Sequence, residues 1–149
     1  MLNPDYKEML SLLLDNEVDF LLVGAYALAA HGFPRATADI DIFVKPSSEN
    51  ATLVFKTLEE FGAPTHNVSV NDFVQPGTIL QIGVAPRRID IITEIDGLTF
   101  DEAADGKEII ELEGLSIPVI SRENLIVNKL ATGRDKDKLD ADNLRNAST

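Results

Sequence analysis

Cysteine is absent from the sequence, and so is any long apolar run. Without cysteine the chain can form no disulfide and no thiolate zinc site. The longest apolar run, residues 20–30, is too short to span a bilayer and contains a glycine. The first ten residues lack the basic and apolar regions of a signal peptide. These absences predict a cytoplasmic protein with no membrane partner.

Acidic residues outnumber basic ones, 25 to 13, which gives a formal net charge of −12. An excess of this size repels nucleic acid and anionic membranes unless a basic patch is concentrated locally. It also suggests a bound cation, because crowded carboxylates become tolerable when a divalent ion lies among them. With 149 residues and 44% hydrophobic content, the chain is expected to fold as a single domain over 1–149.

Hydrophobic periodicity changes between helical and strand patterns along the chain. Helical spacing and capping signals predict helices at residues 3–16, 25–31, 47–61, 121–130 and 136–147, with a helical turn at 100–104. Apolar or alternating runs predict strands at residues 20–23, 39–44, 78–84, 88–93, 109–112 and 115–119. This order predicts an α/β (α+β) fold with a mixed β-sheet flanked by helices.

Three aspartates interrupt strongly apolar strand patterns. Asp39 and Asp41 are two residues apart on one predicted strand, so their carboxylates face the same side. Asp90 lies between isoleucines on another predicted strand, so pairing of the two strands would bring all three carboxylates together. Two like charges about 4 Å apart cost on the order of 4 kcal/mol at an effective dielectric near 20. A cation bound by oxygen ligands alone, Mg²⁺ or Mn²⁺, would relieve that repulsion.

A D-x-D pair taken alone is more often a solvated strand face or edge protection. The metal interpretation therefore depends on Asp90 and on the turn that precedes the pair. Gly24 follows an apolar strand, and glycine there permits a tight turn and close approach of a phosphate to backbone amides. The N-terminus of the following helix favours an anion, although an ordinary strand-to-helix turn has the same pattern.

The spacing of these elements is more specific than any one of them. The pattern consists of Val23-Gly24-Ala25, thirteen intervening residues, Asp39-Ile40-Asp41-Ile42, and the later Ile89-Asp90-Ile91. It resembles the signature of the DNA-polymerase-β-like nucleotidyltransferase superfamily. More narrowly, residues 25–32, 35–37 and 134–140 are similar to small bacterial nucleotidyltransferase-like proteins related to the AbiEii toxins. The sequence departs from the superfamily at Ala25, where glycine or serine is usual, so a hydroxyl contact to phosphate is lost.

The resemblance implies a nucleotidyltransferase fold and a nucleoside triphosphate substrate. It implies that Asp39 and Asp41 ligate two Mg²⁺ ions, and that Asp90 completes one metal site and helps to deprotonate an acceptor hydroxyl. Two ions bridging the phosphates would stabilise the attacking and leaving oxygens of an in-line displacement. The relation to toxins makes tRNA or protein acceptors plausible and raises the prospect of a cognate partner protein.

Further residues are candidates for phosphate binding. Gly24 and Ala25 would contribute backbone amides, and Arg35, next to Thr37, either pairs with phosphate or forms a surface ion pair. Lys129 is favoured as a phosphate contact by the resemblance, although a lysine in an apolar helix stretch can also extend harmlessly to solvent. The expected ion-pair network that orders the last helices consists of Arg134, Lys136, Asp137 and Asp140.

Three functional hypotheses remain open at this stage. The first is an enzyme that transfers a nucleotide, with Mg²⁺, to a hydroxyl on RNA, protein or a small molecule. The second is a nucleotide-binding or protein-interaction module that keeps the fold but has weak chemistry, which Ala25 favours and three intact carboxylates oppose. The third is a structural protein with an acidic surface, which predicts no response of stability to Mg²⁺.

Overall fold

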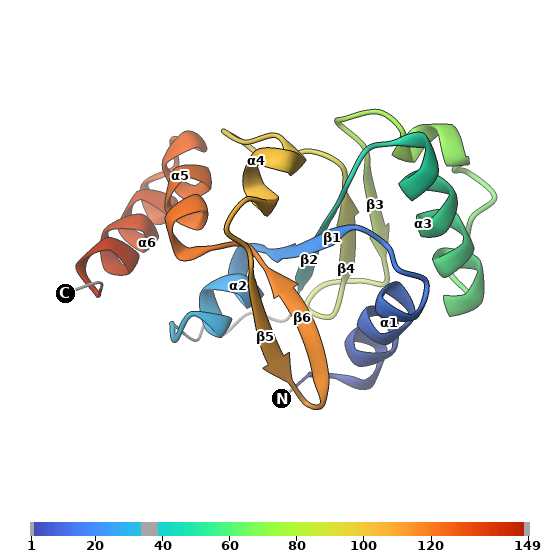
Figure 1. The fold of residues 1–149 in the computed structure, drawn as a ribbon, viewed down its shortest axis with the longest axis horizontal. Helices are drawn as coiled ribbons and strands as arrows, with labels where there is room; N and C mark the ends of the chain where they lie inside the picture. The colour runs from blue at the N-terminus through green and yellow to red at the C-terminus, as the bar shows by residue number, and fades with distance from the viewer. Residues whose placement is uncertain (1, 34–38, 148–149) are drawn as a thin grey trace.

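A mixed six-stranded β-sheet forms the centre of the computed structural model, which describes residues 2–33 and 39–147 (Figure 1). The strand order is β3-β4-β2-β1-β6-β5. Pairs β1–β6 and β2–β4 are parallel, and pairs β1–β2, β3–β4 and β5–β6 are antiparallel. The strands are β1 (Phe20–Val23), β2 (Ile40–Val44), β3 (Ile79–Ile82), β4 (Ile89–Ile92), β5 (Glu108–Leu112) and β6 (Leu115–Val119).

Helices flank this sheet at both ends. Helices α1 and α3 pack against each other on one side, and α5 and α6 pair at the opposite end of the molecule, as Figure 1 shows. The helices are α1 (Pro4–Asp15), α2 (Gly24–Ala30), α3 (Ser48–Phe61), the 3₁₀ helix η1 (Val70–Phe73), α4 (Phe100–Ala104), α5 (Arg122–Ala131) and α6 (Asp135–Asn146). The predicted fold class, a mixed sheet flanked by helices, is confirmed.

Local capping chemistry sets several helix ends. The Asn3 side chain accepts a hydrogen bond from the Tyr6 amide at 2.9 Å and begins α1. Ser47 and Ser121 accept from amides three residues later and begin α3 and α5, as predicted. Helix α3 ends at Gly62, whose φ of 87° is the left-handed conformation that glycine adopts without penalty. Some predicted bounds shift: α2 begins at Gly24 rather than at residue 25, and α6 begins at Asp135 rather than at residue 136.

Strand β2 lies inside the sheet, and its alternation places apolar and acidic side chains on opposite faces. Ile40, Ile42 and Val44 are fully buried. Asp41 faces the other way, next to Val23 of β1 and next to Asp90 of β4 in the ladder register. Because β1 ends at Val23, the turn at Gly24 begins directly beside Asp41. Within the described residues, no helix is long and apolar enough to cross a bilayer.

Candidate active site

The three predicted aspartates meet at one edge of strands β2 and β4. Asp41 and Asp90 are lateral neighbours on parallel strands, so their side chains emerge from the same face of the sheet. Asp39 precedes β2, and its side chain is 27% exposed, against 10% for the side chain of Asp90. The pairing of the two carboxylate strands, on which the site prediction depended, is therefore present in the structure.

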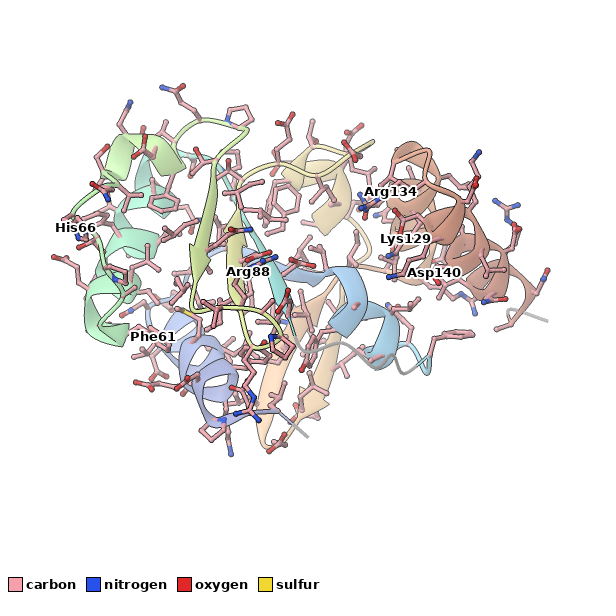
Figure 2. The ribbon with its side chains drawn as sticks, turned by 180° about the vertical axis from the view of Figure 1, so that it is seen from behind. Phe61, His66, Arg88, Lys129, Arg134 and Asp140 are labelled. Carbon is pink, nitrogen blue, oxygen red and sulfur yellow. The ribbon has the colours of Figure 1, made fainter. Side chains whose placement is uncertain are left out.

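Arg88 lies among these carboxylates. Its Nε donates a hydrogen bond to Oδ1 of Asp90 at 2.7 Å, and its Nη2 donates to Oδ2 at 3.1 Å. The same Nη2 lies 3.4 Å from Oδ2 of Asp39, whose Oδ1 accepts from the Arg88 backbone amide at 3.1 Å. The pKa of Arg88 is raised, chiefly by the hydrogen bond with Asp90. Figure 2 shows Arg88 over the central strands, apart from Lys129 and Arg134 on the C-terminal helices.

Asp41, like Asp39, is half-buried, whereas Asp90 is buried. Burial is the largest influence on the pKa of Asp41, followed by the charge of Asp90 and hydrogen bonding with that residue. Together they raise the pKa of Asp41 to about 6, although Arg88 opposes the shift. A cation would stabilise the ionised form of a carboxyl group that resists ionisation through burial and through a neighbouring carboxylate.

The glycine turn touches this carboxylate directly. Gly24 has a φ of 68°, a conformation that side chains rarely adopt. A Cβ atom at position 24 would overlap Oδ2 of Asp41 and lie 3.1 Å from its Cγ. Glycine is therefore required twice over at this position, by backbone conformation and by the closeness of Asp41. Ala25, the next residue, keeps its backbone at the start of α2 and lines the adjoining cleft.

A cleft of about 590 Å³ opens beside the turn. One wall carries Gly24, Ala25 and Asp41. The opposite wall comes from α5, α6 and their connection and carries the cations Lys129, Arg134 and Lys136. The cleft thus places three basic groups and four acidic groups, Asp41, Glu94, Asp96 and Asp137, around one space, which suits a ligand that carries both phosphates and a metal ion.

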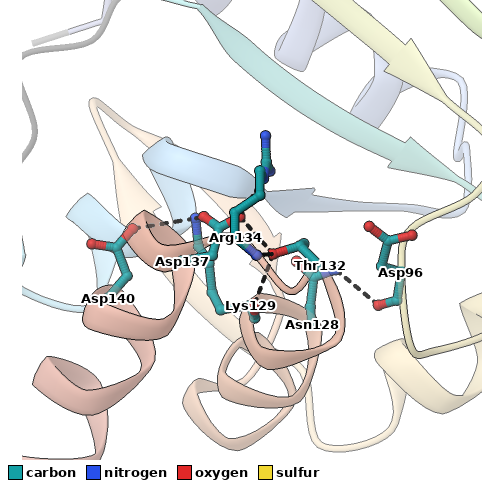
Figure 3. A network of polar contacts seen from close by, with 7 residues as sticks. All are labelled: Asp96, Asn128, Lys129, Thr132, Arg134, Asp137 and Asp140. Carbon is teal, nitrogen blue, oxygen red and sulfur yellow. Dashed lines mark hydrogen bonds and ion pairs between the residues drawn. The ribbon is translucent and has the colours of Figure 1, made fainter.

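The cationic wall is held by a buried network between α5 and α6 (Figure 3). Lys129, whose side chain is 12% exposed, lies 3.2 Å from Oδ1 of Asp137 and 3.5 Å from Oδ2 of Asp140. Thr132 and Arg134 both donate to Oδ2 of Asp137 at 2.7 Å. Burial alone would raise the pKa of Asp137, but the bonds from Thr132 and Lys129 and the charges of Lys129 and Arg134 hold it below its usual range.

Arg134, Asp137 and Asp140 of the network predicted for the last helices are connected, with Lys129 as a member that the prediction had placed on phosphate, whereas Lys136 lines the cleft. Both descriptions are compatible, since Lys129 also lines the cleft. Arg134 extends from the same network and is 75% exposed at its side chain. Asn128 adds a connection from α5 to the far side of the cleft, donating to the Asp96 carbonyl at 2.9 Å.

The structure brings together most of the predicted site residues. Gly24, Ala25, Asp41 and Lys129 line one cleft, whereas Asp39 and Asp90 are paired with Arg88 outside its lining, with Asp90 next to Asp41 in the sheet. Arg35 and Thr37 lie outside the described residues. His31 of the α2 C-terminus is bonded at Nε2 to the Ile120 carbonyl at 2.8 Å.

Arg88 is the site residue whose role the sequence did not reveal. The available signal was its position two residues before Asp90, because residues i and i+2 of a strand share one face.

The donor set fits a hard divalent cation, since it consists of carboxylate oxygens alone. In the described parts of the chain, no three acidic or histidine side chains enclose a space for an ion. The reason lies in the geometry above: Asp39 and Asp90 are both bonded to Arg88. The pKa of Asp41 is raised first by burial and then by the charge of Asp90, and a metal ion would oppose both effects by stabilising the ionised carboxylate.

The class that this fold and site define is that of the nucleotidyltransferases. The model of the family described as nucleotidyl transferase of unknown function (DUF2204) matches residues 3–148, and the chain belongs to that family. This confirms the predicted enzyme class. No curated protein sequence matches the chain.

Solved structures share the fold at low sequence identity. The Thermotoga maritima protein TM1012, a proposed nucleotidyltransferase, has a TM-score of 0.65 at 21% identity, over 99% of this chain and 94% of its own. The antibiotic-resistance factor ANT(2″)-Ia has a TM-score of 0.61 at 13% identity, over 97% of this chain and 82% of its own. The lincosamide antibiotic adenylyltransferase LnuA, bound to lincomycin, has a TM-score of 0.59 at 18% identity, over 97% of each chain.

Proposed function

We propose that the protein transfers a nucleotidyl group from a Mg²⁺-bound nucleoside triphosphate to a hydroxyl of an acceptor, releasing pyrophosphate. The observation that carries the proposal is the parallel register of Asp41 and Asp90, because Asp41 lines a cleft that the glycine turn and the cations Lys129, Arg134 and Lys136 also line. In-line transfer needs positioning and charge stabilisation more than covalent participation of the protein, and this arrangement supplies both.

The residues divide this work between the two walls. Asp39, Asp41 and Asp90 would hold Mg²⁺, or Mn²⁺, which supplies charge at the phosphates and aligns the reacting oxygens. The backbone at Gly24 and Ala25 lets a phosphate approach the start of α2. Lys129, with Arg134 and Lys136 beside it, faces the same space and would bind the outer phosphates. Asp90 would also accept a proton from the acceptor hydroxyl.

The proposal includes three classes of acceptor: a small molecule, tRNA and protein. The fold neighbours include adenylyltransferases of antibiotics, which supports a small-molecule hydroxyl. The resemblance to AbiEii toxins supports tRNA or protein and a cognate partner. The net charge of −12 opposes an extended nucleic-acid surface. Action in the cytoplasm and a toxin–antitoxin role remain predictions from the sequence.

A second candidate, a nucleotide-binding module with weak chemistry, is favoured by two observations. Ala25 has no hydroxyl that could donate a hydrogen bond to a phosphate. Arg88 forms ion pairs with two of the three carboxylates, Asp39 and Asp90. Both candidate functions predict nucleotide binding, so catalytic turnover is the measurement that distinguishes them.

The deciding experiment has a binding arm and a turnover arm. Thermal melting with Mg²⁺ and each nucleoside triphosphate is measured for the wild type, Asp41→Asn and Asp90→Asn, with exposed Glu59→Gln as the charge-matched control. A ligand at about 100 times its dissociation constant stabilises the fold by about 2.7 kcal/mol. We expect one triphosphate to raise the melting temperature of the wild type and of Glu59→Gln, with the effect lost in both aspartate variants. No shift in any protein would contradict nucleotide binding and with it both candidates.

The turnover arm uses the triphosphate identified by melting, labelled at its α-phosphate. It is incubated with tRNA, with a protein extract, and with a panel of hydroxyl-bearing small molecules. Label on an acceptor together with pyrophosphate release supports the transferase. Binding with no label on any class supports the weak-chemistry module.

A further inference from the structure

Among the described residues, Arg88 is the cation that pairs with the carboxylates Asp39 and Asp90. It is bidentate on Asp90 and reaches Asp39, while its side chain is 28% exposed. A guanidinium group presents a rigid fork that matches a carboxylate, so this is a specific arrangement rather than a loose surface contact. The ion pair uses both oxygens of Asp90, which are the donors that a metal ion would need.

Hydrogen bonds with three other residues hold the backbone of Arg88, independently of the ion pairs of its side chain. Its amide donates to Oδ1 of Asp39 at 3.1 Å, and its carbonyl accepts from the Ile40 amide at 3.0 Å. The hydroxyl of Tyr6, a fully buried residue of α1, donates to the same carbonyl at 3.3 Å. The side chain can therefore leave Asp90 by rotating about its own bonds while the strand and the carboxylates stay in place.

The electrostatic balance explains what the side chain does there. Two aspartates side by side on neighbouring strands repel each other, and a third carboxylate adds to the repulsion. Arg88 supplies one positive charge among them, and a divalent ion would supply two. The two cations require the same oxygens of Asp90, so binding of one opposes binding of the other.

We propose that Arg88 is a positioning residue that acts as the resident counter-cation of the site. Without metal, Arg88 holds Asp39 and Asp90 together. When a divalent ion binds, the Arg88 side chain releases Asp90. The inference rests on the metal site of the proposed function. It predicts opposite effects of removing Arg88: lower stability without metal and higher affinity for metal. A residue with a purely structural role would lower both.

The test measures Mn²⁺ binding by electron paramagnetic resonance and melting temperature in chelator, for the wild type, Arg88→Ala and Arg88→Gln. Arg88→Gln keeps hydrogen-bonding capacity without charge and remains informative if Arg88→Ala does not fold. The neighbouring exposed Arg87 gives the matched control Arg87→Ala, which removes the same charge outside the site. Asp90→Asn reports whether Mn²⁺ binds at the carboxylates.

We expect both Arg88 variants to melt at lower temperature in chelator and to bind Mn²⁺ about tenfold more tightly than the wild type, a change of about 1.4 kcal/mol. Arg87→Ala should match the wild type in both measurements. Mn²⁺ binding that is equal or weaker in the Arg88 variants would overturn this inference and leave the metal site standing. If no protein binds Mn²⁺, or if Asp90→Asn binds it as the wild type does, the proposed metal site is overturned and this inference with it.

Discussion

Gly24 and Asp41 lie so close that the glycine has no room for a side chain. A Cβ atom at position 24 would overlap Oδ2 of Asp41, and the φ of 68° is strained for any other residue. The contact joins the end of β1 to the middle of β2. It places the backbone of the turn against a carboxylate that the proposed function assigns to metal.

Gly24→Ala is therefore expected to damage the site and the fold together. Backbone strain and overlap should lower the free energy of unfolding by about 2 to 4 kcal/mol. Gly114→Ala is the control, because Gly114 also has positive φ, 86°, but nothing lies within 4 Å of its added Cβ. Denaturant unfolding of both variants isolates the contact with Asp41. Equal losses in the two variants would show that strain alone matters at position 24.

In the absence of metal, the contribution of Asp41 to stability should fall as the pH rises through about 6. Its folded pKa is raised to about 6 from a usual value of 3.8, so the folded state holds more protons between these values than the unfolded state. Stability from this group is complete below the unfolded pKa and is lost as pH rises through the folded pKa. Asp41→Asn should remove this dependence and melt higher than the wild type at pH 8 in chelator, whereas Glu59→Gln should keep the wild-type profile. An unchanged profile in Asp41→Asn would refute the assignment.

Asp137→Ala should destabilise the C-terminal helices. The change removes the buried carboxylate that Lys129, Thr132 and Arg134 share and leaves Lys129 with Asp140 as its acidic partner, which costs about 2 to 4 kcal/mol. Asp142→Ala on the same helix is the control, because its ion pair with Arg145 is long, 3.9 Å, and exposed. Urea unfolding compares the two variants.

The contribution of Asp137 to stability should also depend on pH. Because the folded pKa of Asp137 is lowered, its contribution to the free energy of unfolding is present at neutral pH and is lost as the pH falls through that pKa.

Ala25→Ser tests whether a phosphate lies at the turn. A serine hydroxyl at the start of α2 would add one hydrogen bond to a charged group, and we expect nucleotide affinity to rise about tenfold. Ala29→Ser, a half-buried position later in the same helix, is the control for the added polar group. Isothermal titration with the triphosphate and Mn²⁺ measures both. A gain that Ala29→Ser shares would show that the effect does not arise from the turn.

Local elements could be predicted because their signals are local. Ser47 and Ser121 begin helices since a hydroxyl accepts from an amide three residues later, which needs nothing beyond neighbouring sequence. The shared face of Asp39 and Asp41 follows from strand alternation in the same way. The family signature then linked Gly24 to these aspartates, which local patterns alone could not do.

Other features depend on pairings between distant segments. Nothing near Leu22 indicates that Val119 lies beside it in the sheet, and nothing near Lys129 indicates that it faces Asp41 across a cleft. Arg88 showed the same limit, since its partner Asp39 lies in a distant segment, just before β2. Strand registers and cleft walls are set by tertiary packing, which a single sequence does not reveal.

The pairing of β1 with β6 also bears on how the protein is made. During synthesis β1 emerges early and can pair with β2 soon afterwards, but its other neighbour, β6, emerges far later. Until then the strand that ends at Gly24 has one unpaired edge, and α5 with its cations has not left the ribosome. Folding that waits for distant partners is slow, and exposed strand edges invite aggregation. A nascent chain therefore carries its acidic residues for most of synthesis before it gains the basic wall that completes the cleft.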